Sequence, residues 1–189
     1  MSESFYTPEE LAGLGLAAYG EDVKISRHCI IYGADKITIG SHVRIDDFCY
    51  LSGAITLGSY IHIAAYTALF SGTEGIVMED FTGLSSRVCI YAQSNDYSGA
   101  MLTNPTVPSE YCGEYGGTVT LKKHVIVGTG STILCGVTVG EGSAVGAMSL
   151  VTKDVAPWTI CCGIPARPVK ERKKDLLQYE EKMRADGLL

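Results

Sequence analysis

Aliphatic side chains recur at every sixth position through most of this 189-residue chain. They are Ile39, Ile45, Leu51, Leu57, Ile63 and Leu69, then Met78, Leu84 and Ile90, and then Leu121, Val127, Ile133, Val139, Val145 and Val151. A period of six matches neither the helical period of about 3.6 residues nor the alternation of a strand. One short strand plus one tight corner needs about six residues, so three such units close a triangular coil of about 18 residues. The repeat predicts stacked coils joined by parallel strand ladders, with the aliphatic side chains facing inward.

Two insertions interrupt the repeat. Leu69 and Met78 are nine positions apart, which indicates three extra residues within 72–75, and Ile90 and Leu121 are 31 apart, which indicates 25 extra residues. We expect the larger insertion, residues 92–117, to leave the coils as a long loop. Long loops on a rigid scaffold are where binding and catalytic residues concentrate, so this loop is a candidate functional region.

The two ends of the chain are predicted to cap the open edges of the coils. Residues 1–22 form the N-terminal cap, in which the Thr7–Glu10 spacing of a capping box predicts a short helix from Pro8 to about Leu14. Residues 23–168 form the β-helix. Residues 169–189 form a C-terminal segment whose Glu, Lys, Arg and Leu pattern predicts one amphipathic helix from Val169 to about Asp186. The predicted fold class is therefore all-β with two helical ends.

Charge and cysteine usage narrow the functional classes. A net charge of −6 argues against a protein that coats a nucleic acid polymer or an anionic membrane. No apolar run reaches the 18 or so residues that membrane insertion requires, and the start of the chain lacks the features of a secretory signal, so we expect a cytoplasmic protein. Seven cysteines without a CxxC pair predict free thiols rather than a disulfide framework or a metal site. Cys29, Cys49 and Cys161 fall on small inward positions and are expected to fill the core.

Over about residues 23–170, the repeats resemble the hexapeptide-repeat acyltransferases. The pattern is [LIV]-[GA]-x-x-[STVC]-x, and residues 145–155 followed by 163–170 are similar to the closing signature of that family. The resemblance implies a left-handed parallel β-helix, a homotrimer with active sites between subunits, and an acyl-CoA co-substrate, either acetyl-CoA or another. The left hand rests on the resemblance alone, since strand crossovers generally favour the right hand.

Within that family, the N-terminal helix and the large loop resemble the maltose and galactoside acetyltransferases. Residues 58–66, 85–87 and 95–99 look closer to N-acyltransferases that act on nucleotide-linked amino sugars. This likeness implies N-acylation of a nucleotide-linked 4-amino-4,6-dideoxy sugar, in the biosynthesis of a surface polysaccharide.

The maltose and galactoside enzymes usually carry a catalytic histidine at the start of the loop, but residues 90–97 contain none. A hydroxyl nucleophile, with a pKa of about 15 like water, needs such a base. An amine with a pKa near about 8 is partly neutral at pH 7, so it needs orientation and late removal of a proton. Asp96, beside the missing histidine, is the predicted catalytic carboxylate, and Asn95 the predicted substrate ligand. A turn-forming role for Asp96 is the alternative.

Two further catalytic candidates lie on corners of the coils. With the insertions removed, residues 85–87 stack between 64–66 and 128–130, so the Ser86 hydroxyl is expected to orient the sugar or donate to the thioester oxyanion. Glu141 lies on another corner and is expected to meet Asp96 across a subunit interface. The alternative for each is an ordinary corner residue.

Three more residues are predicted to contact the substrate, namely His62, Tyr66 and Arg87. His62 is expected to point outward from a strand, with interface packing as its alternative role, and His124 to be a solvated corner residue.

The cofactor prediction rests on corners with small residues, which let a pantetheine arm approach the backbone. The predicted cofactor-binding residues are Gly128, Thr129, Gly146, Ala147, Thr152, Lys153, Arg167 and Lys170. Arg167 and Lys170 would bind CoA phosphates, or else form the basic first turn of a surface helix. No metal is expected.

Two other functions are considered. One is sugar O-acetylation with His62 or a carboxylate as the base, against which the missing loop histidine argues. The other is a zinc-dependent or scaffold β-helix. A zinc enzyme needs about three protein ligands, and the four histidines of the chain do not fall on one stack.

Overall fold

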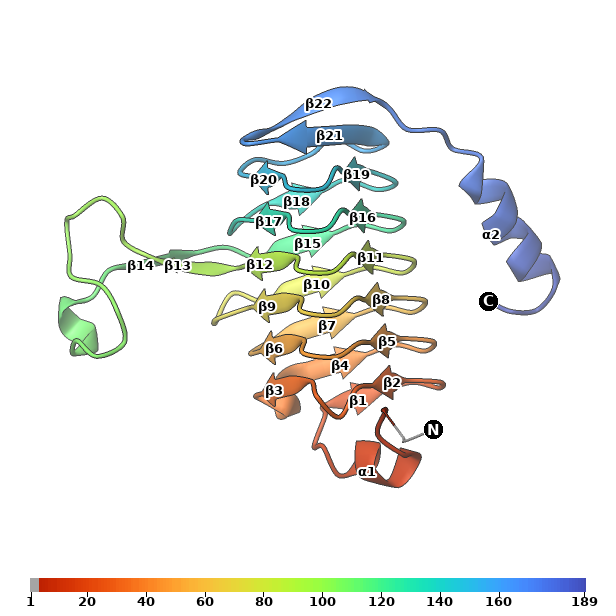
Figure 1. The fold of residues 1–189 in the computed structure, drawn as a ribbon, viewed down its shortest axis with the longest axis horizontal. Coiled ribbons are helices and arrows are strands. Elements are labelled where there is room, and N and C mark those ends of the chain that lie inside the picture. Colours follow the sequence, from red (N-terminus) through yellow and green to blue (C-terminus); the bar gives the residue numbers. More distant parts are fainter. Residues whose placement is uncertain (1–3) are drawn as a thin grey trace.

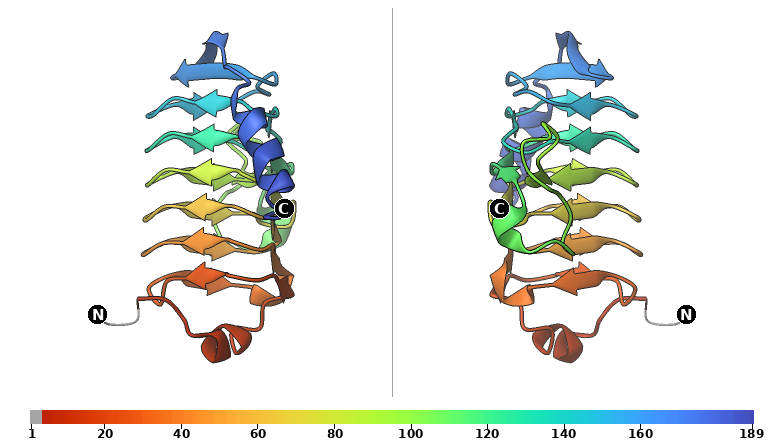
Figure 2. Two further views of the ribbon diagram at one scale, coloured as in Figure 1. Left: turned by 90° about the vertical axis from the view of Figure 1, so that its right-hand side faces the viewer. Right: turned by 90° about the vertical axis from the view of Figure 1, so that its left-hand side faces the viewer.

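The computed structural model describes residues 4–189, so residues 1–3 of the predicted N-terminal cap lie outside the described residues. Short parallel strands stack into a three-sided column with a helix beside it and an arm that projects away from it (Figure 1). The two lateral views show the coils lying one above another along the whole column (Figure 2). No helix among the described residues is long and apolar enough to cross a membrane.

Three sheets form the sides of the column. Sheet 1 contains β1 (Ala18–Tyr19), β4 (Ile37–Ile39), β7 (Ile55–Leu57), β10 (Ile76–Met78), β15 (Val119–Leu121) and β18 (Thr138–Val139). Sheet 2 contains β2 (Lys24–Ile25), β5 (Arg44–Ile45), β8 (His62–Ile63), β11 (Gly83–Leu84), β16 (Ile126–Val127), β19 (Ala144–Val145), β21 (Thr159–Gly163) and β22 (Ala166–Glu171). Sheet 3 contains β3 (Ile30–Tyr32), β6 (Tyr50–Ser52), β9 (Ala68–Phe70), β12 (Cys89–Tyr91), β17 (Thr132–Ile133) and β20 (Leu150–Val151).

Strand register confirms the predicted period and both insertions. Ile45 pairs with Ile63, 18 positions later. Leu57 pairs with Met78 across the three-residue insertion, and Met78 pairs with Leu121 across the 25-residue one. The ladders therefore continue through both insertions without a change of face.

All fifteen aliphatic residues of the repeat are buried, none more than 3% exposed. The small inward positions are buried too, including Cys29 and Cys49, whereas Cys161 is buried at the aliphatic position of the repeat, because it pairs with Val145. All seven cysteines are free thiols. Burial raises the pKa of the Cys49 thiol to about 11, which keeps it protonated and unreactive at neutral pH. The prediction of cysteine as core filler is confirmed.

The large insertion folds into an arm. Its base is an antiparallel ribbon of β13 (Gln93–Asn95) and β14 (Glu114–Gly116), and a 3-10 turn, η2 (Ser109–Tyr111), lies near its tip. The arm stands away from the column on the side opposite the C-terminal helix (Figure 1). The smaller insertion forms a wider turn between β9 and β10, and η1 (Ala34–Lys36) occupies the equivalent turn between β3 and β4.

At the N-terminus, the predicted helix is present as α1 (Pro8–Ala12), with both hydrogen bonds of the Thr7–Glu10 capping box. It ends two residues before the predicted Leu14. The strand β1 then joins sheet 1 inside the segment predicted as cap, because Tyr19 already pairs with Ile39. The coils thus begin earlier than the predicted residue 23.

The C-terminal prediction is wrong in its first part. Residues 166–171 do not begin a helix but form β22, which pairs antiparallel with β21. The last coil leaves an open edge at β21, and β22 pairs with it as the outermost strand, where Pro168 is accepted because an edge strand does not need every backbone N–H. The resulting hairpin caps the last coil, and the helix α2 (Leu176–Ala185) follows only after a short connection. Lys170 is therefore a strand residue and not part of a first helical turn.

The helix α2 lies along one edge of the column, which we call the helix edge (corner residues 40–42, 58–60, 79–81, 122–124 and 140–142) (Figure 2). A ladder of stacked rings follows this edge through His42, Tyr60, Phe81 and His124, with neighbouring ring centroids 4.8 to 5.1 Å apart. Each of the four has a left-handed φ between 58° and 64°. The shared backbone conformation aligns the rings from one coil to the next.

His124 was expected to be solvated, and that expectation is wrong. It is only 7% exposed, because α2 covers it and its Nε2 lies 2.7 Å from Glu180 Oε2. Lys123 Nζ contacts the other oxygen of Glu180 at 2.5 Å, and Arg172 donates to the carbonyl oxygen of His124 at 2.8 Å. Glu180 is thus the ionic attachment of α2 to the column.

Coil stacking imposes a steric requirement that the variant Gly40→Ala would test. A Cβ on Gly40 would lie 2.5 Å from the carbonyl atoms of Gly58 in the next coil, whereas a Cβ on Gly83 would meet nothing within 4 Å. We expect Gly40→Ala to lower the free energy of unfolding by about 1–3 kcal/mol, measured by urea denaturation. The matched control Gly83→Ala should be neutral, or stabilising by at most about 1 kcal/mol. Equal effects of the two changes would contradict the steric argument.

The attachment of α2 gives a second prediction. Hydrogen bonds from Lys123 and His124 lower the pKa of Glu180, Lys123 being the larger cause. A lowered pKa means that the stabilisation is complete above the ordinary glutamate pKa and is lost as the pH falls through the lower folded value. We expect Glu180→Gln to raise deuterium uptake in residues 176–185 at pH 7, with the coils unaffected. Glu181→Gln, on the exposed side of the same helix, is the control and should leave uptake unchanged.

Candidate functional site

The corner that carries Ser86 belongs to the edge between sheets 2 and 3. We call it the serine edge (corner residues 46–48, 64–66, 85–87, 128–130 and 146–148). The predicted stacking of these corners is confirmed, since Arg87 N donates to Ala65 O at 3.1 Å and Gly130 N donates to Ser86 O at 3.1 Å. The middle position of each corner is occupied in turn by Asp47, Ala65, Ser86, Thr129 and Ala147.

Two hydroxyl groups meet at this edge. The Thr129 hydroxyl donates to the backbone carbonyl oxygen of Ser86 at 2.6 Å. The two side-chain oxygens, Ser86 Oγ and Thr129 Oγ1, lie 3.1 Å apart. Ser86 is half-buried and Thr129 is exposed, so both can be reached by a bound molecule.

Tyr66 and Arg87 occupy the next position of their corners, with left-handed φ values of 64° and 61°. Tyr66 is 57% exposed and stacks on Phe48 of the coil below, with ring centroids 5.1 Å apart. The structure therefore brings the predicted residues Tyr66, Ser86, Arg87 and Thr129 onto one edge, with their side chains on the surface.

Asn95 and Asp96 lie at the start of the arm, on the third edge of the column. Asp96 accepts hydrogen bonds from the backbone N–H groups of Ser98 at 2.7 Å and Met101 at 3.0 Å, one to each carboxylate oxygen. Hydrogen bonds from Ser98, with help from Met101, lower the pKa of Asp96. The carboxylate is thus held ionised in a fixed orientation and shapes the loop, as the turn-forming alternative expects, while its catalytic role stays a prediction.

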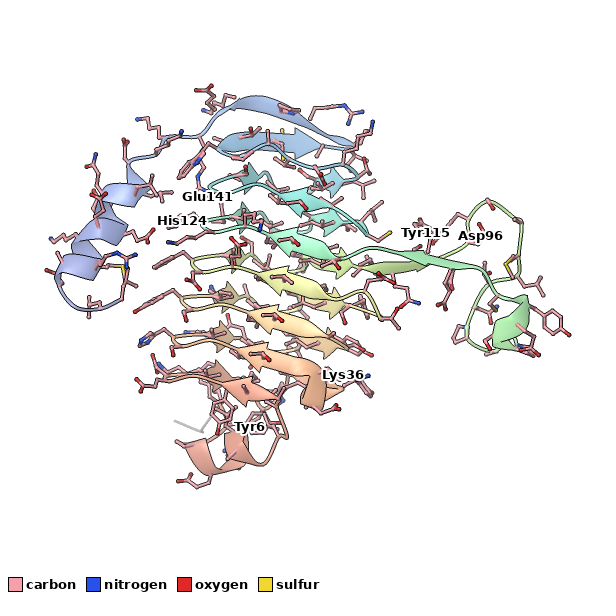
Figure 3. The ribbon with its side chains drawn as sticks, turned by 180° about the vertical axis from the view of Figure 1, so that it is seen from behind. Tyr6, Lys36, Asp96, Tyr115, His124 and Glu141 are labelled. Carbon is pink, nitrogen blue, oxygen red and sulfur yellow. The ribbon has the colours of Figure 1, made fainter. Side chains whose placement is uncertain are left out.

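Glu141 lies on the helix edge, so one chain does not bring it together with Asp96. The two carboxylates project from opposite sides of the column (Figure 3). The Glu141 backbone carbonyl oxygen accepts from Trp158 N at 2.7 Å, and its exposed side chain lines a shallow cleft with Glu79, Lys122 and Asp154. Any site that uses both carboxylates must therefore include a second copy of the chain.

His62 points outward from β8, as predicted, in register with Arg44 and Gly83 on the neighbouring strands. Its Nε2 lies 2.8 Å from Asp46 Oδ2, and Arg44 Nε contacts the other oxygen of Asp46 at 2.6 Å. Burial opposes ionisation of Asp46, but the hydrogen bonds from His62 and Arg44 prevail and lower its pKa. His62 is therefore paired with Asp46, the first residue of a corner of the serine edge.

The predicted cofactor-binding residues separate into two groups. Gly128, Thr129, Gly146 and Ala147 lie on the serine edge, and Arg167 continues the edge because it pairs with Cys162, whose Cβ lies 2.7 Å from the Cβ position of Gly146. A Cβ on Gly128 would lie 2.5 Å from Ala147 N, so the two glycines are required by coil stacking itself. Thr152 and Lys153 are exposed in the turn after β20, and Lys170 pairs with Ile160 toward the opposite end of β22.

Sequence reasoning missed the contact between Ser86 and Thr129, although it named both residues for different roles. The signal was available, since the two are 43 positions apart, which equals one coil plus the 25-residue insertion. It also missed the role of Glu180 and Arg172 in holding α2, for which the repeat contains no signal. Among residues 4–189, no group of three or more side chains could hold a metal ion.

No family model matches the chain, but individual proteins do. A dTDP-4-amino-4,6-dideoxy-D-glucose acyltransferase from Escherichia coli is 46% identical over 174 residues, which is 90% of this chain and 90% of that protein.

Two solved structures of AntD, an N-acyltransferase from Bacillus cereus, match almost the whole chain. A serine-to-cysteine variant in complex with dTDP-4-amino-4,6-dideoxyglucose and coenzyme A has a TM-score of 0.96 at 47% identity, and covers 98% of this chain and 100% of that one. AntD in complex with dTDP and 3-hydroxybutyryl-CoA has a TM-score of 0.95 at 48% identity and covers 98% of both chains. The predicted left-handed parallel β-helix is confirmed by this likeness. The chain therefore belongs to the hexapeptide-repeat acyltransferases, in the branch of the nucleotide-linked amino-sugar N-acyltransferases.

Proposed function

We propose that this protein transfers an acyl group from acyl-CoA to the 4-amino group of a nucleotide-linked 4-amino-4,6-dideoxy sugar. The observation that carries this proposal is the match to AntD, which was solved with such a sugar and with coenzyme A. The arm agrees with it, because Asn95 and Asp96 stand where an O-acetyltransferase of the maltose type would carry a histidine. We also propose that the protein acts in the biosynthesis of a surface polysaccharide and that it is located in the cytoplasm.

The proposed active unit is a homotrimer with each site between two subunits. The separation of Asp96 and Glu141 on opposite sides of one column supports this arrangement (Figure 3). In an assembly with closed symmetry, the arm of one copy can reach a neighbouring copy at every interface in the same way. A site that is incomplete in one chain is then completed by its neighbour.

In the proposed reaction, the neutral amine attacks the thioester carbonyl carbon directly, without an acyl-enzyme. The C–N bond forms, the C–S bond breaks, and the proton lost by the amine reaches the CoA sulfur, which leaves as the thiol. Asp96 is ionised, so it orients the amine and relays its proton rather than retaining it. Glu141 would share this task from the neighbouring subunit, and Ser86 assists at the reacting centre.

The acyl-CoA is proposed to lie along the serine edge. Thr129, Ala147 and Arg167 are exposed there and succeed one another toward the C-terminal hairpin. The Arg167 guanidinium is suited to a CoA phosphate because its donors can bind two phosphate oxygens at once. Gly128 and Gly146 keep the coils in close contact beneath the proposed path of the pantetheine chain of CoA. Thr152, Lys153 and Lys170 extend the proposed contacts beyond this edge. Asn95, His62, Tyr66 and Arg87 are proposed sugar-nucleotide contacts.

The choice of acceptor is the first test of this function. We expect release of the CoA thiol from acetyl-CoA or 3-hydroxybutyryl-CoA with a dTDP-linked 4-amino-4,6-dideoxy sugar, and at least about a hundredfold lower kcat/KM with the 4-hydroxy analogue, since no strong base is present for a hydroxyl. Plain hexosides serve as the second comparison. Faster turnover of the hydroxyl acceptors would instead support the O-acetyltransferase alternative, with His62 as the base.

Sharing of the site between subunits is tested by mixing two variants. Asp96→Ala and Glu141→Ala should each lower kcat by about a hundredfold or more, which is the usual contribution of a general acid or base. When the two variant chains are refolded together, mixed trimers contain some sites with both native carboxylates, so activity should recover to a fraction of the native value. Co-refolding each variant with itself is the control. No recovery in mixed trimers of the correct mass would mean that both residues act within one subunit.

A further inference from the structure

The hydrogen bonds between Ser86 and Thr129 have a defined direction. A hydroxyl has one proton to donate and two lone pairs that accept, whereas a carbonyl oxygen can only accept. The Thr129 proton is therefore committed to the Ser86 carbonyl oxygen, 2.6 Å away. In the 3.1 Å contact between the two side-chain oxygens, Ser86 must then be the donor.

This direction fixes what Ser86 can offer to a substrate. Its single proton points along the column toward Thr129, so only its lone pairs face the surface. Such a hydroxyl is ready to accept a hydrogen bond from an amine or ammonium N–H, whereas to donate one to a thioester oxyanion it would have to give up its bond to Thr129. Of the two roles expected for Ser86, the geometry favours orientation of the sugar.

The backbone makes the arrangement rigid. The Ser86 carbonyl oxygen accepts from Gly130 N at 3.1 Å as well as from Thr129, so two donors of the next coil hold it. Ala65 and Ala147, which occupy the same corner position in the coils on either side, have no polar side-chain atom to compete. The hydroxyl of Thr129 therefore contacts both the carbonyl oxygen and the side chain of Ser86, with no competing side chain from these two coils.

We propose that Thr129 is a positioning residue that turns the Ser86 hydroxyl into a hydrogen-bond acceptor for the 4-amino group of the sugar. This inference rests on the proposed function and deepens it, because it names the group that distinguishes an amine from other substituents at C4. It also replaces the role of Thr129 as a direct ligand of the cofactor.

The first experiment measures binding in the absence of acyl-CoA. The dissociation constants of a dTDP-linked 4-amino-4,6-dideoxy sugar and of its analogue with hydrogen in place of the amine are compared by calorimetry. Ser86→Ala and Thr129→Val should each weaken binding of the amino sugar by about three- to tenfold, the usual effect of losing one hydrogen bond. Binding of the analogue should not change. If Ser86→Ala lowers kcat while the amino sugar binds as before, Ser86 acts on the transition state instead and the inference is wrong.

The second experiment is a double-variant cycle. If Thr129 acts through Ser86, then Thr129→Val lowers kcat/KM in the native protein but causes no further loss in the Ser86→Ala protein. Thr129→Ser keeps the hydroxyl and should restore most of the activity. Thr38→Val, an outward threonine of β4 in sheet 1, is the matched control and should be neutral. An increase in the KM for acyl-CoA that persists in the Ser86→Ala protein would show that Thr129 binds the cofactor directly.

Failure of this inference is distinguishable from failure of the proposed function. If the native protein neither binds nor acylates the amino sugar, the function is wrong. If it does both, and the Thr129 and Ser86 variants behave independently, only the role of Thr129 is wrong.

Discussion

The parallel pairing of coils determines the rest of this structure. Each strand is too short to form a stable unit alone, so its backbone groups must be satisfied by the coil above and the coil below. That pairing keeps the aliphatic residues in one inward column, where Ile63 is fully buried between Ile45 and Leu84. It also holds the spacing constant, which leaves no room for a Cβ at corners such as Gly40 and Gly128. The column is therefore rigid where it is regular. Side chains can differ most freely from the repeat at its corners, its insertions and its ends.

The pairing of coils also determines which side chains meet at the corners. One backbone conformation repeats along an edge, so side chains at equivalent corner positions come within contact distance whatever their separation in sequence. On the helix edge, this repetition aligns the rings of Tyr60, Phe81 and His124, which α2 then covers. On the serine edge, it places Thr129 over Ser86 and determines the direction of their hydrogen bonds. The edges thus differ in chemistry while sharing one geometry.

The fold could be predicted because its signal is periodic. A residue such as Val127 is buried for the same reason as Leu84, so counting by six and allowing for two insertions gave the column, the stacked corners and the outward position of His62. The C-terminal hairpin could not be found in this way. Residues 166–171 contain charged and apolar residues in an order that also suits a helix, and only the open edge of the last coil, which must be paired, makes them a strand. His124 is likewise buried by a segment that is distant in the sequence, because the helix α2 that covers it begins 52 positions later in the chain.

The candidate site was predictable in its residues but not in its arrangement. Ser86 and Asp96 were named from a corner and from a missing histidine, and the repeat placed Glu141 on a different corner. The repeat could not give the path of the arm that carries Asp96, because the 25 inserted residues do not follow the period of six. A three-sided column that packs around a symmetry axis presents different edges of two copies to each other at every interface. Residues that lie far apart in one chain can then lie close together when they come from two neighbouring chains. The dispersal of Ser86, Asp96 and Glu141 over separate edges is therefore what the proposed site between subunits would require, because no single copy brings the three residues together.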